Sequence, residues 1–474
     1  MGSFIPFSRD QEYLLPPSMN DWLPQDHLAR FIVEVVEQLD LSKLIRRYSG
    51  CGSAAYHPAL MLALLIYGYA TGIFSSRKIE RATYDSVAFR FIAAEQHPDH
   101  DTLANFRKTF LVELEELFVQ VLTLAQAMKL VRLGQIALDG TKIKANASKH
   151  KALSYGHIEK LEAQLRDEVQ ALLQRAMDVD EGEVADGVDL PQEIARREDR
   201  LHALEEAKAK IAERVKARDE QAQQAYEEKV ARREAQRAAG HPPKGKEPQP
   251  PKTGPRPKDQ VNLTDEESRI MPSGQGFVQG YNAQAAVDVD TMLVLATTVT
   301  QEPNDKQQLK PMLKELGELP NALGGVETLL ADNGYFSQDN VKACADQNMT
   351  PLIALGREAH HLPLAERLAP DAPPPDTDDP VIKMAHALKT QTGRALYGQR
   401  KCTVEPAFGI IKHVMGFRQF SLRGLAAVSG EWKLVDGIQS KADARVGGDI
   451  KGQQRRDALL VPGRNPDSPI HWTP

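Results

Sequence analysis

The chain has few cysteines, no long apolar run and no excess of basic residues. Its three cysteines, Cys51, Cys344 and Cys402, lie far apart in 474 residues. This spacing excludes a zinc finger or a disulfide framework and indicates a reducing compartment. The longest apolar stretch, residues 59–74, is shorter than the roughly 20 residues that a membrane span needs. We therefore expect a buried helix there and no membrane partner.

The charge balance gives no overall sign of nucleic-acid binding. Lys and Arg number 59 against 65 Asp and Glu, for a formal net charge of −6. Any contact with DNA must therefore come from local basic patches, which acidic segments elsewhere hide in the total. The first residues also lack the basic start and apolar core of a signal peptide, so we expect no export.

Residues 1–130 have a helical pattern. Ser76 is placed to begin one helix over SRKIERATYDSVAFRFI, and Asp101 can cap another after the turn HPDHD. A short helix, a tight turn and a capped second helix would suit helix-turn-helix docking, with Arg107 and Lys108 against DNA. The other interpretation is a plain helical bundle, which the pattern alone favours.

Residues 151–239 have a different character. Two runs of apolar residues at steps of three and four are separated by an acidic segment broken by Gly and Pro. This pattern predicts an antiparallel helical hairpin with a coiled-coil-like seam and solvated charged faces. Residues 240–258 then hold seven prolines and five Lys or Arg against one Glu. We therefore expect an extended basic linker over residues 240–261.

Residues 131–150 and 262–435 indicate an α/β core, because predicted strands alternate with predicted helices. Two of the strands close on an acid: QIALDG on Asp139 and TLLADNG on Asp332. Strand ends at the rim of a sheet are where α/β proteins build their sites. Taken singly, each acid could instead be a turn residue, since Asp-Gly and Asn-Gly commonly mark turns.

Glu405 is the third notable acid. Val404, Phe408, Ile411 and Met415 form one apolar face, which predicts a last helix from about Thr403 to His413. Pro406 fits best in the first turn of a helix, so we expect Glu405 near the helix N-terminus, where its charge is favourable.

A basic set surrounds this one acid. Its members are Arg400, Lys401, Lys412, Arg418 and Arg423. A carboxylate among cations suits a metal site beside a phosphate backbone. The alternative is a solvated basic helix with a single intrahelical ion pair.

Three carboxylates on separate segments suggest phosphoryl transfer with two divalent ions. Two such ions about 4 Å apart can activate an attacking hydroxyl and stabilise a leaving oxygen. Hard oxygen ligands hold Mg²⁺, so carboxylates are needed rather than thiolates or imidazoles. We take Asp139, Asp332 and Glu405 as the candidate ligands.

The motifs resemble those of the DDE transposases of bacterial insertion sequences. The resemblance covers most of the chain, including ALDGTKIKANAS, GFVQGYNAQAAVD, LLADNGYFS and YGQRKCTVEPAFGIIKHVMGFRQFSLRGL. One subgroup carries Y-x2-R-x3-E-x6-K around the glutamate. Tyr397, Arg400, Glu405 and Lys412 match it, except that four residues separate Arg400 from Glu405. Alternatively, Lys401 takes the arginine role.

The resemblance implies a ribonuclease H-like core in which Asp139, Asp332 and Glu405 hold two Mg²⁺ ions, with Mn²⁺ also possible. It implies cleavage at inverted-repeat ends and transfer of the freed 3′-hydroxyl to target DNA. The helical N-terminal region would bind the inverted repeats, and the protein would act as a homodimer in the bacterial cytoplasm, at the nucleoid. The residues expected to contact DNA are Tyr397, Arg400, Lys401, Lys412, Arg418, Arg107 and Lys108.

The tail, residues 436–474, departs from this resemblance, which implies a final apolar helix there. The segment DGIQSKADARV can be encoded by a nucleotide string that, one base later, encodes Met-Ala-Tyr-Asn-Leu-Lys-Arg-Met-His-Ala-Leu. That peptide is a better amphipathic helix. We therefore hypothesise a frameshift near Val435 and a disordered tail. The alternative function is then a catalytically impaired copy that binds the ends and regulates active copies.

Overall fold

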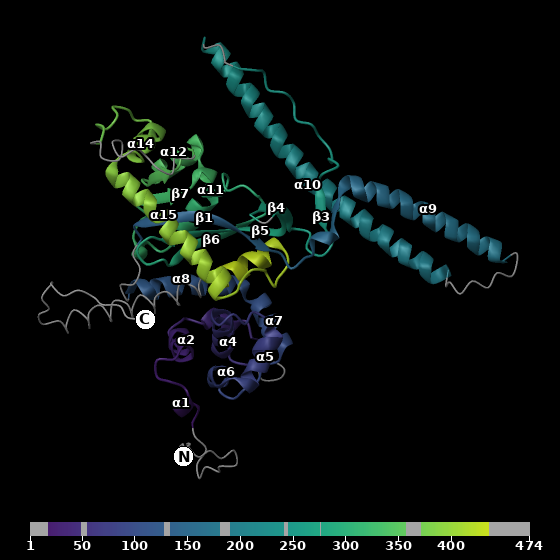
Figure 1. Ribbon diagram of the computed structural model, residues 1–474, viewed down its shortest axis with the longest axis horizontal. Coiled ribbons are helices and arrows are strands. Elements are labelled where there is room, and N and C mark those ends of the chain that lie inside the picture. The colour runs from purple at the N-terminus through teal and green to yellow at the C-terminus, as the bar shows by residue number, and fades with distance from the viewer. Residues whose placement is uncertain are drawn as a thin grey trace, which may run out of the picture. The chain divides into compact units, whose positions relative to one another are not determined.

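The structure is a computed structural model that describes residues 18–48, 55–127, 133–180, 190–240, 245–274, 276–356 and 371–435 (Figure 1). The tail hypothesis for residues 436–474 lies outside these residues. The chain divides into two units, one formed by Met1–Ile143 with Asn282–Pro474 and the other by Lys144–Tyr281. Each unit is described by itself.

The N-terminal part of the first unit is helical, as predicted. Its helices are α1 (Met19–Trp22), α2 (Leu28–Glu37), α3 (Ser42–Arg46), α4 (Pro58–Ala70), α5 (Ser76–Asp85), α6 (Val87–Ala93), α7 (His100–Thr109) and α8 (Leu111–Ala127). Most of α4 is buried, which confirms the buried helix expected from the longest apolar stretch. Among the described helices, none is both long and apolar enough to span a bilayer.

Two helix predictions in this region are wrong in detail. The helix beginning at Ser76 is interrupted at Ser86, whose backbone is extended, so that α5 and α6 are separate. Asp99, not Asp101, caps α7: its side chain accepts the Thr102 N–H at 2.9 Å. The carboxylate of Asp99 accepts one of the N–H groups that the first turn of a helix leaves without a partner. Asp101 lies inside that first turn and is exposed.

The sheet of the first unit confirms the α/β class. Its strands are β1 (Gln135–Lys144), β5 (Gly276–Asp288), β6 (Val294–Thr300), β7 (Thr328–Ala331) and β8 (Thr350–Ile353), in the order β6-β5-β1-β7-β8. β7 is parallel to both β1 and β8, whereas β5 and β6 form the predicted antiparallel hairpin. β1 and β5 run in opposite directions, because Gln135 bonds to Val289 while Gly140 faces Gln284.

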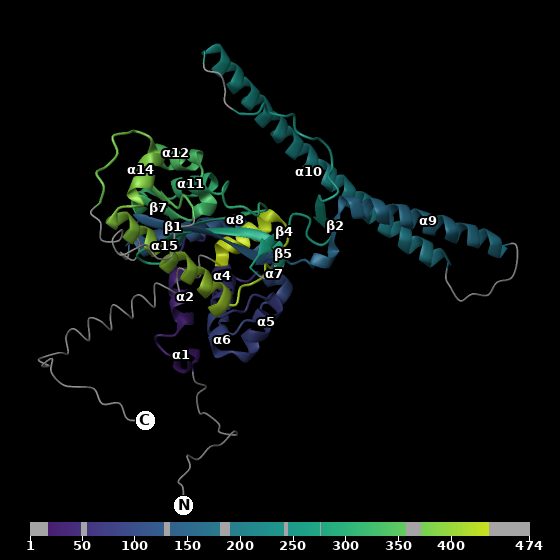
Figure 2. The same ribbon diagram turned by 45° about the horizontal axis from the view of Figure 1, so that its top comes forward.

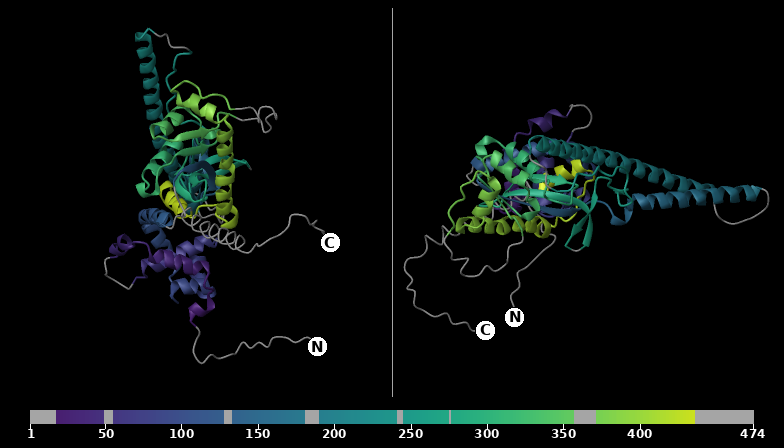
Figure 3. Two further views of the ribbon diagram at one scale, coloured as in Figure 1. Left: turned by 90° about the vertical axis from the view of Figure 1, so that its left-hand side faces the viewer. Right: turned by 90° about the horizontal axis from the view of Figure 1, so that it is seen from above.

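Helices α11 (Leu309–Gly317), α12 (Gln338–Asp346), α14 (Pro380–Ala387) and α15 (Gln391–Gly409) accompany this sheet. α15 lies across one face of it (Figures 1 and 3). Residues 425–435 are also helical. The middle strands are buried, with Ile136, Leu329 and Leu330 fully inaccessible. Such continuous apolar runs are expected of strands covered on both faces.

The prediction that Glu405 begins a helix is wrong. α15 starts fourteen residues earlier, at Gln391, where Thr390 caps it by accepting the Gly393 N–H at 3.0 Å. Pro406 therefore lies inside the helix, where it lacks the N–H that would bond to the fourth residue before it. The helix continues as a π-helix, Ile410–Val414. Val404, Ala407 and Ile411 are fully buried around this point.

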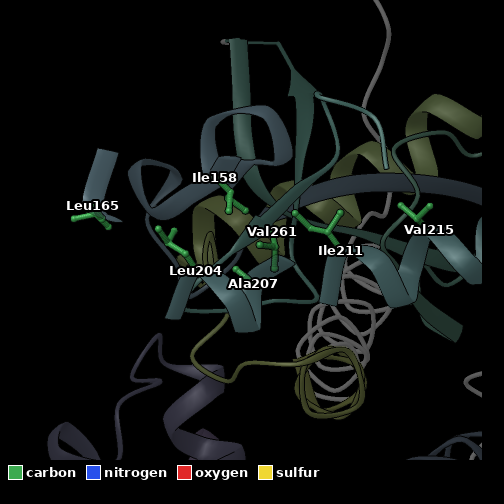
Figure 4. Close-up of a cluster of buried hydrophobic side chains, with 7 residues drawn as sticks. All are labelled: Ile158, Leu165, Leu204, Ala207, Ile211, Val215 and Val261. Carbon is green, nitrogen blue, oxygen red and sulfur yellow. The ribbon is translucent and has the colours of Figure 1, made fainter. Parts of the chain in front are cut away.

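The second unit contains the predicted pair of helices. Its elements are β2 (Ala152–Ser154), α9 (Tyr155–Asp180), α10 (Leu190–Ala238), β3 (Gln260–Asn262) and β4 (Arg269–Ser273). α9 packs against the first half of α10 (Figures 2 and 3). The seam is a buried apolar cluster drawn in Figure 4, made of Ile158, Leu165, Leu204, Ala207, Ile211, Val215 and Val261. The coiled-coil character of this pair stays a prediction.

The second half of α10 runs beyond α9 and beyond the apolar cluster. An extended part of the predicted linker lies beside it instead (Figures 1 and 2). Arg218 donates to the Gly254 carbonyl at 3.0 Å, and Arg233 donates to the Gly245 carbonyl at 2.9 Å. Polar contacts of arginines with backbone carbonyls therefore hold together the arm formed by residues 216–240 and 245–258.

Candidate active site

The two predicted aspartates come together on adjacent strands. Leu138 of β1 is paired with Ala331 of β7 in a parallel register, and Asp139 and Asp332 are the next residues along each strand. Asp332 follows the end of β7, and its Oδ1 accepts the Gly334 N–H at 2.8 Å. The parallel register therefore brings the two acids beside each other, although only Asp332 follows the end of its strand.

Asp139 does not end its strand, contrary to the prediction, because β1 continues to Lys144. Gly140 is therefore not a turn residue. A Cβ at Gly140 would clash with the amide of Gln284 and would lie 2.6 Å from Asp305 Oδ1. The glycine is needed because neighbouring side chains already fill the space that its own side chain would take.

Asp139 has a perturbed acidity. Burial and the negative charges of Asp332 and Asp305 raise its pKa to about 6, against the lowering effects of the Gly140 N–H and the Arg400 guanidinium. Like charges held together in a partly desolvated place favour the uptake of a proton or a cation. The arrangement therefore suits a divalent cation bound to oxygen ligands.

Arg400 reaches Asp139 from α15. Its Nη1 donates to Asp139 Oδ2 at 3.1 Å, and its side chain is only 10% exposed. Its Nε is buried without a hydrogen-bond partner. Arg400 is thus committed to the acid on β1 rather than presented to solvent.

Lys412 reaches the same stretch of β1. Its Nζ donates to Thr141 Oγ1 and lies 3.5 Å from the Lys142 carbonyl. Burial and the nearby positive charge of Lys142 lower the pKa of Lys412. Two basic residues of α15 and its π-helical extension therefore converge on residues 139–142.

Glu405 does not join the aspartates. Its residue is exposed, and in the part of the chain that the structure describes no three His, Cys, Asp or Glu side chains are gathered so as to hold a metal ion. It nevertheless lies along the helix between Arg400 and Lys412, whose heads reach Asp139 and Thr141.

The other residues predicted to contact DNA differ in their solvent exposure. Lys401, Arg418 and Lys108 are exposed, and Tyr397 is half-buried. Arg107 is buried and donates to the Tyr69 hydroxyl at 2.7 Å and the Phe74 carbonyl at 3.2 Å. A phosphate contact by Arg107 is therefore at odds with the structure, because its guanidinium is used in the helical core.

Several polar residues of the site were missed at the sequence level. They are Lys142, Asn282, Gln284, Asp305 and Tyr335. A signal existed, since Asn282 and Gln284 interrupt the buried apolar strand β5 at alternate positions and so share one face. Asp305, in the segment EPNDKQQ, has the sequence context of an ordinary helix cap.

Comparison with known families gives two matches. Residues 17–109 match the family model described as Transposase domain (DUF772), and residues 239–435 match the one described as Transposase DDE domain. No curated protein and no solved structure matches the chain. The second match contains Asp332, Glu405 and the basic residues of α15, whereas Asp139 precedes it.

Proposed function

Because the chain belongs to the DDE transposases of insertion sequences, we propose that it cuts DNA at the ends of its own element and joins the freed 3′-hydroxyl to target DNA. A DDE domain implies a ribonuclease H-like fold, and the mixed sheet β6-β5-β1-β7-β8 is consistent with it. The observation that supports the proposal most directly is that Asp139 on β1 lies beside Asp332, the residue that follows the parallel strand β7.

The enzymes of this family use divalent metal ions, and the donor set fits them. Asp139 and Asp332 provide hard oxygen ligands that repel each other when no cation is bound. We propose Mg²⁺ as the ion, with Mn²⁺ as a substitute, and Glu405 as the third ligand. When bound, two such ions would activate the attacking oxygen and stabilise the leaving oxygen. Because Glu405 is exposed, we infer that its side chain turns toward the aspartates when cation and DNA bind.

The residues of α15 have divided roles in this proposal. Arg400 donates to Asp139 Oδ2, while Oδ1 accepts the Gly140 N–H at 2.8 Å and keeps a second lone pair for a cation. Lys412 fixes the following residues of β1. Lys401 and Arg418, being exposed, bind DNA phosphates beside the cut, with Tyr397 next to them. In this proposal the buried basic residues orient Asp139 and its strand, and the exposed ones position the DNA.

The direct test is Mg²⁺-dependent nicking of a duplex that carries the element's own ends. Asp139→Asn, Asp332→Asn and Glu405→Gln should each lower the nicking rate by roughly 100-fold or more, as expected for removal of a charge that stabilises the transition state. The matched control is Glu318→Gln, an exposed acid at the end of α11. Nicking by Glu405→Gln at the parental rate would remove Glu405 from the site.

A second candidate function is that of an end-binding regulator that no longer cuts. The observation in its favour is that the match to the DDE domain stops at residue 435, where the helical pattern of the sequence also collapses. A gel-shift assay with the same duplex separates the two functions. End binding without nicking in the parent chain would favour the regulator.

A further inference from the structure

Asp305 lies just before α11, and one of its oxygens accepts two hydrogen bonds and faces an ammonium group. Its Oδ1 accepts the Asn282 amide at 2.7 Å and the Gln284 amide at 2.8 Å, and Lys142 Nζ lies 3.6 Å away. The two amides come from β5 and the ammonium from β1. An acid that is only 23% exposed in its side chain is thereby surrounded by donors from two neighbouring strands.

Gln284 carries this arrangement onward to the Asp332 turn. A carboxylate only accepts hydrogen bonds, so the NH₂ group of Gln284 must face Asp305, which leaves its Oε1 for the Tyr335 hydroxyl. Tyr335 is fully buried and ends the short turn Asn333–Tyr335 that Asp332 caps. The charge on Asp305 therefore sets the direction of a hydrogen-bond chain that ends in this turn.

The same chain packs against β1 beside Asp139. The side chains of Gln284 and Asp305 occupy the space where a side chain of residue 140 would lie. Two residues further along β1, Lys142 contacts Asp305. The chain Asp305–Gln284–Tyr335 thus touches the strand that carries Asp139 and the turn that Asp332 begins.

We propose that Asp305 is a positioning residue that fixes the separation of Asp139 and Asp332 for divalent-ion binding, which rests on the proposed function. Backbone pairing of β1 with β7 fixes the two strands but does not extend into the turn after Asp332. Asn340 ties the Tyr335 carbonyl of this turn to α12 at 2.7 Å, and the Tyr335 hydroxyl, held through Gln284, ties the same turn to β5. Groups behind metal ligands commonly act in this way, and their removal weakens metal affinity by roughly 10- to 100-fold.

The test measures Mn²⁺ binding to the full chain by electron paramagnetic resonance, together with DNA nicking over a range of Mg²⁺ concentrations. Asp305→Asn keeps the shape but presents an NH₂ group to the two amides. It should raise the Kd for Mn²⁺ by roughly 10- to 100-fold, and raised Mg²⁺ should restore its nicking rate. A general loss of folded protein would instead lower nicking at every Mg²⁺ concentration.

Two further variants complete the design. Tyr335→Phe breaks the same chain at its other end, so it should also weaken Mn²⁺ binding, and it decides the matter if Asp305→Asn does not fold. Adding it to Asp305→Asn should cause little further loss, because both act through Gln284. Asp339→Asn removes an exposed acid in the first turn of α12 and should leave the Kd unchanged.

The outcomes separate the two proposals. If Asp305→Asn and Tyr335→Phe bind Mn²⁺ like the parent, while Asp139→Asn does not bind it, the positioning role is overturned and the metal site stands. If Asp139→Asn binds Mn²⁺ as the parent does, the metal site itself fails, and the positioning role fails with it.

Discussion

At the residue scale, Gly140 is the point where the β1 backbone lies against the hydrogen-bonded side chains of Gln284 and Asp305. Gly140→Ala would place a methyl group against the Gln284 amide and 2.6 Å from Asp305 Oδ1. Overpacking of this kind costs about 1–3 kcal/mol of unfolding free energy, which urea denaturation measures. The control is Gly134→Ala, whose added Cβ would meet no atom within 4 Å. Equal stability of the two variants would mean that the polar side chains move aside freely.

The raised pKa of Asp139 predicts a pH-dependent stability. Its pKa moves from 3.8 to about 6 in the folded protein, so the folded state binds this proton more tightly than the unfolded state. The resulting stabilisation is complete below pH 3.8 and is lost as the pH rises through about 6. Asp139→Asn has no such loss, so without divalent ions at pH 8 it should be more stable than the parent by about 3 kcal/mol.

Urea unfolding at pH values from 4 to 8 in a chelating buffer measures this difference. At pH 4 the parent and Asp139→Asn should have similar stability, because the parent's acid is then largely protonated. Added Mn²⁺ should reverse the order at pH 8, since only the parent keeps the carboxylate for the ion. Parallel pH profiles for the two proteins would contradict the burial of this charge.

At the scale of the element, the part of α10 after Val215 is notable because it lacks a packed apolar face. No residue of α10 after Val215 belongs to the buried core, and isolated helices without tertiary packing are marginally stable. Beyond Glu228 the helix has three exposed basic residues, Lys229, Arg232 and Arg237, against one acid, Glu234. Lys252 is exposed on the linker segment beside the helix. Such a surface is complementary to a phosphate backbone.

Neutralising these four basic residues to Gln should weaken DNA binding in a salt-dependent manner. If all four contact phosphates, the slope of log K against log salt should become less steep by about 3 to 4. The matched control neutralises Lys160, Arg166, Arg196 and Arg200, which are exposed on the proximal part of the helical pair. An unchanged slope for the arm variant would identify the arm charges as merely solvated.

At the scale of the molecule, a buried polar contact joins distant parts of the first unit. The Tyr69 hydroxyl of α4 donates to Glu431 Oε1 at 3.1 Å and accepts from Arg107 at 2.7 Å. Glu431 is fully buried and also accepts the N–H groups of Ser421 and Leu422. The N-terminal helices and the last described helix therefore share one charged network.

Tyr69→Phe removes the hydroxyl and leaves two buried charges facing each other without their bridge. Unsatisfied buried groups cost about 1–3 kcal/mol, so we expect a loss of that size in urea unfolding. Tyr84→Phe, at a tyrosine that is 56% exposed, is the control for the same chemical change. If both variants lose the same stability, the network does not join the two segments energetically.

The predicted domain ranges can be compared with the two structural units. The hairpin and linker, residues 151–261, fall inside the second unit, which extends further at both ends to Lys144 and Tyr281. The unit boundaries fall within β1 and β5, because these strands continue from one unit into the other. The boundary between the helical region and the core at residue 130 stays a prediction.

The sequence by itself determined what depends on neighbouring residues along the chain. Apolar periodicity identified the N-terminal helices, the long helical pair and the β5–β6 hairpin, and the acids that follow the apolar runs QIAL and TLLA identified Asp139 and Asp332. These features are local, since helix and strand faces repeat every few residues.

Only the tertiary structure decided what depends on segments far apart in the chain. It showed that Asp139 lies inside a strand, that Pro406 lies inside a helix and that Arg107 lies in the core. It also brought Asp305, Gln284 and Tyr335 together behind the aspartates. Their side chains resemble ordinary cap and core residues until the sheet aligns β1, β5 and β7, because a hydrogen-bond chain between strands has no signature within any one of them.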